Sequence, residues 1–160
     1  MKQWRYYVAY GSNLNLEQMA KRCPDAEFVG TGMLEEYELQ FRGKAGGAYA
    51  TIEQKTGKQV PILLWKISGR DEKRLDLYEG YPSFYGKQTV EVEIDGTAYT
   101  AMLYEMQPGM EYNSPSPQYY HTIQEGYQTL GLPLPALEEA FLFSVKQSQK
   151  ETSYEIEPQW

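Results

Sequence analysis

The sequence is poor in the side chains that most often serve as nucleophiles or metal ligands. Its 160 residues include one cysteine, Cys23, and one histidine, His121. A single cysteine excludes an intrachain disulfide, and a single histidine excludes a histidine-rich metal site, so no metal is expected. A Ser-His or Cys-His pair would require His121 to face the site, whereas a lone histidine on a predicted helix more often packs or faces solvent.

Long hydrophobic runs and nucleotide-binding motifs are also missing. The apolar runs are far shorter than the ~20 residues of a membrane span, and no apolar signal segment follows Met1-Lys2-Gln3. We therefore expect a soluble, cytoplasmic protein without a membrane partner. Neither G-x-G-x-x-G nor G-x-x-x-x-G-K-[ST] occurs, so no dinucleotide or P-loop site, and no other cofactor, is expected.

Acidic residues and tyrosines dominate what is present. The net charge of -7 argues against nucleic acid as a partner. Fifteen tyrosines point to a polar cleft or interface, because tyrosine buries area yet keeps a polar tip, although half-exposed strand positions would explain most of them. The length fits one domain, predicted over residues 1–149, followed by a tail at 150–160 that is either unstructured or covers a neighbouring subunit.

The order of the hydrophobic patterns predicts an α+β fold. Asp95-Gly96 between two alternating runs indicates a β-hairpin. Strand runs outnumber strand–helix–strand units, so a mainly antiparallel sheet or small barrel is favoured over a doubly wound fold. The predicted strands are 4–10, 26–33, 36–41, 48–53, 60–67, 89–94 and 98–104; the predicted helices are 15–23, 71–78, 117–130 and 135–149, with a loop at 43–47 and a turn at 55–58.

Glu79 stands out among the carboxylates because it ends a predicted helix immediately before Gly80. The helix dipole repels a carboxylate at this end, and apolar neighbours would raise its pKa further. A glutamate with a raised pKa suits a general base that later acts as a general acid. Most glutamates are exposed, so a frayed, solvated helix end is the commoner outcome. Asp76 shares a helix face with Glu79 and either couples to its titration, faces solvent, or hydrogen-bonds the backbone of a nearby loop, the last two being the commoner outcomes.

The stretch YVAYGSNL, residues 7–14, is a strand that breaks at glycine. Gly11 permits close backbone approach to a ligand, and Ser12 and Asn13 add donors just before a helix. Alternatively, one of Ser12, Asn13 and Asn15 simply caps that helix. Local physics favours neither interpretation. Tyr119, near the start of another predicted helix, either turns its hydroxyl into a cleft or packs in the core.

Four segments together resemble the gamma-glutamylcyclotransferase family: AYGSNL at 9–14, GGAYATI at 46–52, LDLYEGYPSFY at 75–85 and SPSPQYYHTIQEGYQTLGLPL at 114–134. The resemblance implies a small mixed, mainly antiparallel β-barrel flanked by α-helices, no cofactor, and often a homodimer. It places Glu79 on the acid/base glutamate and Tyr119 on a substrate-contacting tyrosine. The substrate-binding loop would comprise Tyr7, Val8, Ala9, Tyr10, Gly11 and Ser12, to which Asn13 adds a donor.

The implied reaction converts a gamma-glutamyl amino acid or amine to 5-oxoproline and the free amino acid or amine. Since the substrate's own α-amine is the nucleophile, the scarcity of histidine and cysteine agrees with this chemistry. Two alternatives stay open. The substrate could instead carry its gamma-glutamyl group on an amine, on a biosynthetic intermediate such as an antibiotic precursor, or in glutathione. Alternatively, the fold could be a non-catalytic small-molecule-binding module.

Overall fold

The computed structural model describes residues 3–155 and consists of one curved five-stranded sheet with helices on both sides. The strand order is β2-β3-β1-β5-β4, and all neighbours are antiparallel except β1 and β5. The strands are β1 (Trp4–Ala9), β2 (Glu27–Arg42), β3 (Tyr49–Ser68), β4 (Tyr85–Ile94) and β5 (Thr97–Met106). The predicted α+β class and the mainly antiparallel sheet are confirmed.

The sheet curls until its two edge strands approach each other without pairing. Gly30 and Gly32 of β2 face Ile94 of β4, where added Cβ atoms would come within 2.7 and 2.8 Å of the isoleucine side chain. Glycine at these two positions therefore lets the edges come together. The result is a barrel-like sheet that hydrogen bonds do not close.

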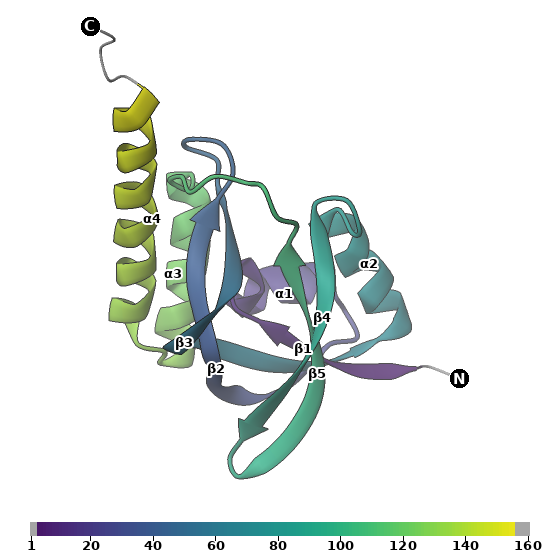
Figure 1. Ribbon diagram of the computed structural model, residues 1–160. Coiled ribbons are helices and arrows are strands. Elements are labelled where there is room, and N and C mark those ends of the chain that lie inside the picture. Colours follow the sequence, from purple (N-terminus) through teal and green to yellow (C-terminus); the bar gives the residue numbers. More distant parts are fainter. Residues whose placement is uncertain (1–2, 156–160) are drawn as a thin grey trace, which may run out of the picture.

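In the described part of the chain, five helical segments surround the sheet (Figure 1): η1 (Ser12–Leu14), α1 (Leu16–Arg22), α2 (Gly69–Glu79), α3 (Pro117–Leu130) and α4 (Leu134–Glu155). Helices α3 and α4 lie side by side against the β2–β3 side, and α2 lies on the other side beyond β4. Helix α4 continues past residue 149, where the tail was expected to begin, and residues 156–160 of that tail lie outside the described part of the chain. None of the helices within residues 3–155 has the length and apolarity to cross a membrane.

Two pairs of predicted strands are in fact single long strands. Residues 26–33 and 36–41 join in β2, which kinks at Glu36, where φ is 66°. Residues 48–53 and 60–67 join in β3, and the predicted turn at 55–58 bulges out of the register between Gln54 and Gln59. The Gly57 amide donates to the Glu36 carboxylate at 2.9 Å across this bulge. Pairing resumes on both sides, so the polar turn residues interrupt the ladder without ending either strand.

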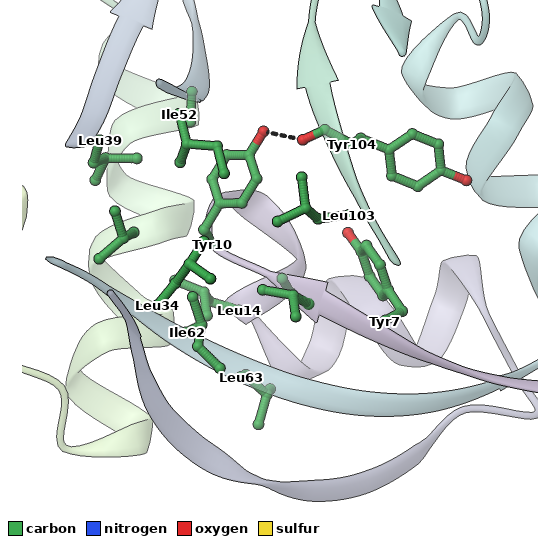
Figure 2. Packing of buried hydrophobic residues seen from close by; sticks show 14 of the residues in the cluster. Tyr7, Tyr10, Leu14, Leu34, Leu39, Ile52, Ile62, Leu63, Leu103 and Tyr104 are labelled. Atoms are coloured by element: carbon green, nitrogen blue, oxygen red, sulfur yellow. Dashed lines mark hydrogen bonds between the residues drawn. The ribbon is translucent and has the colours of Figure 1, made fainter. Parts of the chain in front are cut away.

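The predicted hairpin at Asp95-Gly96 is confirmed. Both residues have positive φ, 49° and 81°, as a two-residue primed turn requires. The core lies inside the curl of the sheet, where Tyr10 packs among aliphatic side chains and its hydroxyl donates to the Tyr104 carbonyl at 2.6 Å (Figure 2). This bond ties the end of β1 to β5.

Helix α3 touches η1 through Gly126, which packs directly against the loop after β1. A Cβ at this position would lie 2.8 Å from the Leu14 carbonyl carbon and oxygen, which are backbone atoms that cannot rotate away. We therefore expect Gly126→Ala to lower the free energy of unfolding by about 1–3 kcal/mol. Urea denaturation would measure this change.

Gly69→Ala is the matched control, because Gly69 is also helical and has no atom closer than 4.0 Å to an added Cβ. Better helix propensity should leave that variant unchanged or slightly stabilised. A Gly126→Ala protein as stable as the Gly69→Ala protein would contradict the packing described here.

Candidate active site

A cavity of about 300 Å³ opens between the loop after β1, the start of β3 and the end of α2. Seven of the residues predicted for the site line it: Tyr7, Tyr10, Gly11, Ser12, Asn13, Glu79 and Tyr119. Val8 and Ala9 do not line it, because their side chains are buried in the core as part of β1. The structure thus brings together residues that lie more than 100 positions apart in the chain.

The loop after β1 separates the two interpretations left open for Ser12, Asn13 and Asn15. Asn15 caps α1, and its side chain accepts from the Gln18 amide at 3.1 Å. Ser12 and Asn13 belong to η1 and line the cavity instead. Different residues therefore cap helix α1 and line the cavity.

Glu79 is half-buried at the end of α2 and is not a frayed, solvated helix end. The helix begins with a capping box between Ser68 and Asp71 and ends at Gly80 in the left-handed region, with φ of 64°. The Tyr81 amide donates to the Asp76 carbonyl at 2.9 Å, which closes the last turn as a Schellman motif. The C-terminal end of the helix is thereby fixed at the cavity wall.

Burial raises the pKa of the Glu79 carboxyl to about 7, and the nearby Arg22 guanidinium partly opposes this rise. The raised pKa was predicted from the sequence, but its main cause is desolvation in the cavity wall. At neutral pH the carboxyl therefore exists in both protonation states, so it can accept a proton and return it.

Seven of the fifteen residues that line the cavity are tyrosines. Tyr119 accepts a hydrogen bond from the Ala50 amide at 3.1 Å, and Tyr85 donates to the Ala50 carbonyl at 2.6 Å. Tyr49, Ala50, Tyr85 and Tyr104 line the cavity but were not singled out from the sequence. The first two lie in the segment GGAYATI, which carried part of the family resemblance, whereas nothing local distinguishes Tyr104 before the strand register is known.

The lining of the cavity does not include the other candidate groups, which are Asp76, His121 and Cys23. Asp76 does not pair with Glu79; it accepts from the Tyr104 hydroxyl at 2.6 Å and contacts Lys87 at 2.9 Å. His121 is exposed beside Glu125, and Cys23 is buried with a pKa raised to about 12. Within residues 3–155 no group of three or more His, Cys, Asp or Glu side chains is arranged to hold a metal ion.

Comparison with known proteins agrees with this geometry. A family profile described as gamma-glutamyl cyclotransferase, AIG2-like, matches residues 7–127, which include the end of β1, all of α2 and most of α3. A solved structure described as a gamma-glutamyl cyclotransferase superposes with a TM-score of 0.77 at 34% identity, covering 86% of each chain. A mouse AIG2-like protein, with a TM-score of 0.56 at 18% identity, shares the fold over 73% of this chain and 82% of its own.

This chain belongs to the gamma-glutamyl cyclotransferase, AIG2-like family, which is a family of enzymes. Two curated relatives carry the name gamma-glutamylcyclotransferase. The cow protein is 35% identical over 80% of this chain and 72% of its own length. The human protein is 33% identical over 94% of this chain and 85% of its own length.

Proposed function

We propose that this protein is a gamma-glutamylcyclotransferase that releases 5-oxoproline from gamma-glutamyl amino acids or amines. The observation that carries the proposal is Glu79, a half-buried carboxyl with a pKa of about 7 in the wall of a tyrosine-lined cavity. Family membership and the names of the cow and human relatives support the reaction class.

In the proposed reaction Glu79 carries two protons, one after the other, from the α-nitrogen of the substrate to the leaving nitrogen. The Glu79 carboxylate takes a proton from the substrate's α-ammonium, and the resulting amine attacks the γ-carbonyl carbon to close a five-membered ring. The protonated Glu79 gives its proton to the leaving nitrogen as the bond between that carbon and the leaving nitrogen breaks. The Glu79 carboxylate then takes the second proton from the cationic ring nitrogen and passes it to the free amine, which departs as an ammonium. Because nucleophile and electrophile share one molecule, positioning supplies much of the rate, and no protein nucleophile is needed.

In this proposal the substrate is oriented by buried polar groups at one end of the cavity and exposed apolar groups at the other. Buried hydroxyls of Tyr7, Tyr10 and Tyr85 form the floor of the cavity, and Leu77 and Tyr78 form an exposed apolar rim at its mouth. We place the polar gamma-glutamyl group at the floor, where the Gly11 and Ser12 amides would hold an oxygen of the substrate. The leaving group then points toward the rim.

A screen of gamma-glutamyl dipeptides and gamma-glutamyl amines for 5-oxoproline release tests the reaction and the substrate class together. Calorimetry with 5-oxoproline, run in parallel, tests the alternative of a non-catalytic binding module. Binding without release from any substrate would favour the module, and release would exclude it. From the resemblance we also propose that the protein is a cytoplasmic homodimer. Light scattering of the purified chain would test the dimer.

The rim makes a specific prediction about the leaving group. Leu77 lines the mouth of the cavity and is 84% exposed, so an apolar leaving group would bury it. We expect Leu77→Ala to lower kcat/KM for gamma-glutamyl-leucine about fivefold relative to gamma-glutamyl-glycine, because about 1 kcal/mol of apolar burial is lost. Leu142→Ala is the control, since Leu142 is also exposed and lies on α4. An unchanged ratio for Leu77→Ala would place the leaving group elsewhere.

A further inference from the structure

Arg22 lies behind the cavity wall and contacts three groups there. Its guanidinium donates to the Asn13 side-chain oxygen and, at 3.3 Å, to the Gln18 side chain. It also stacks on the Tyr78 ring, 3.4 Å from the ring centroid. A guanidinium only donates hydrogen bonds, so the Asn13 amide must present its oxygen to Arg22 and its NH₂ group to the other side.

That other side is the Tyr7 hydroxyl. The Asn13 NH₂ group donates to the Tyr7 oxygen at 2.9 Å, and both side chains are nearly completely buried. The Asn13 backbone is held as well, because its carbonyl accepts from the Trp65 indole at 3.1 Å. With its oxygen accepting from Asn13, the Tyr7 hydroxyl keeps its own hydrogen to donate into the cavity that it lines.

The other cavity tyrosines differ in the direction of their hydroxyl hydrogen bonds. Tyr10 and Tyr85 give their hydroxyl hydrogens to backbone carbonyls, so they present only acceptor lone pairs to the cavity. Tyr119 resembles Tyr7, because its oxygen accepts from the Ala50 amide. Among these four hydroxyls, those of Tyr7 and Tyr119 are set as donors and those of Tyr10 and Tyr85 as acceptors.

We propose that Arg22 and Asn13 are positioning residues that set Tyr7 as the hydrogen-bond donor to the γ-carbonyl oxygen while the ring closes. This inference rests on the proposed function. Negative charge gathers on that oxygen as the α-amine adds to the γ-carbonyl carbon, and a fixed donor stabilises it. Burial and the nearby Glu79 carboxylate raise the pKa of Tyr7 well above its ordinary value, so the hydroxyl stays protonated at neutral pH.

Asn13→Asp is the sharpest test, because it has the same shape and keeps an oxygen for Arg22. The carboxylate replaces the NH₂ donor with an acceptor, so the Tyr7 hydroxyl turns its hydrogen onto residue 13 and away from the substrate. We expect kcat for 5-oxoproline release to fall about 100-fold, with KM changed by less than about threefold. If Asn13 had only a structural role, Asn13→Asp would lower the urea concentration at the midpoint of unfolding. Urea denaturation of the variant, run in parallel, would report this.

Two further variants separate donor orientation from the charge that Asn13→Asp adds. Tyr7→Phe removes the donor and should lower kcat by a similar factor. Arg22→Met leaves the Asn13 amide unfixed and should lower kcat less than Tyr7→Phe does, with Arg22→Lys restoring part of the loss. Because Arg22→Met also removes the positive charge that lowers the Glu79 pKa, kcat is compared at the optimum pH of each variant. In a Tyr7→Phe background, neither Asn13→Asp nor Arg22→Met should lower kcat further, because the group they orient is gone.

The outcomes separate this inference from the proposed function. Suppose first that the wild type releases 5-oxoproline. An unchanged kcat in Asn13→Asp, or fully additive losses of kcat in the double variants, then overturns the inference about Tyr7 and leaves the proposed function standing. If the wild type releases no 5-oxoproline, the proposed function fails. Calorimetry then decides the orientation: weaker 5-oxoproline binding by both Asn13→Asp and Tyr7→Phe supports a donor at Tyr7, and equal or absent binding overturns it.

Discussion

Glu79→Gln is expected to abolish most 5-oxoproline release, lowering kcat by a factor of about 10²–10⁴ while the fold and substrate binding are retained. Glutamine keeps the size of the side chain but cannot accept the ammonium proton or return it to the leaving amine. Because the reaction needs both transfers, no other group in the described cavity wall replaces Glu79: the remaining titratable side chains are tyrosines, and burial raises the pKa values of Tyr7, Tyr10 and Tyr85. Steady-state release of 5-oxoproline from the best substrate in the screen measures the loss.

Glu105→Gln is the matched control for activity. Glu105 is also half-buried, with a pKa raised by burial, but it lines a different hollow between the two hairpins. The same chemical change there should leave kcat unchanged. Unaltered turnover in Glu79→Gln would remove Glu79 from the proton transfers proposed for it.

Glu79→Gln should also make the protein more stable than the wild type above neutral pH. Burial raises the Glu79 pKa from the ordinary value of 4.5 to about 7 in the folded chain. Between these two values the folded state binds more protons than the unfolded state, so the free energy of unfolding falls as the pH rises through this range. The difference corresponds to about 3 kcal/mol, most of which the wild type has lost by pH 7 and all of which it has lost at pH 8. A glutamine side chain at this position does not ionise and loses none of it.

We therefore expect Glu79→Gln to exceed the wild type in free energy of unfolding by about 2–3 kcal/mol at pH 8, with the advantage disappearing near pH 4.5. Urea denaturation of both proteins across this pH range measures the difference. Glu139→Gln, an exposed position on α4, should show a difference within about 0.5 kcal/mol at every pH. An advantage that is absent at pH 8, or that grows toward acid pH, would show that Glu79 is not desolvated in the folded chain.

Much of the fold was predictable because local patterns and local caps agree. Asn15 caps α1, Gly80 ends α2 in the left-handed region, and Asp95-Gly96 makes the hairpin turn, as each short pattern indicated. The extent of β2 and β3 was not predictable in the same way. Polar residues at 55–58 have the composition of a turn, and only pairing on both sides of the bulge keeps β3 continuous.

The sequence by itself determined most of the elements, the family and the two segments proposed to carry the chemistry, because caps, turns and the segments around Gly11 and Glu79 depend on neighbours in the chain. Only the tertiary structure decided that Glu79 is desolvated and that Tyr85 and Tyr104 line the cavity. It also decided that Asn13 is held by Arg22 and directed at Tyr7. Desolvation and hydrogen-bond direction depend on groups from separate elements, and these groups meet only when the sheet curls.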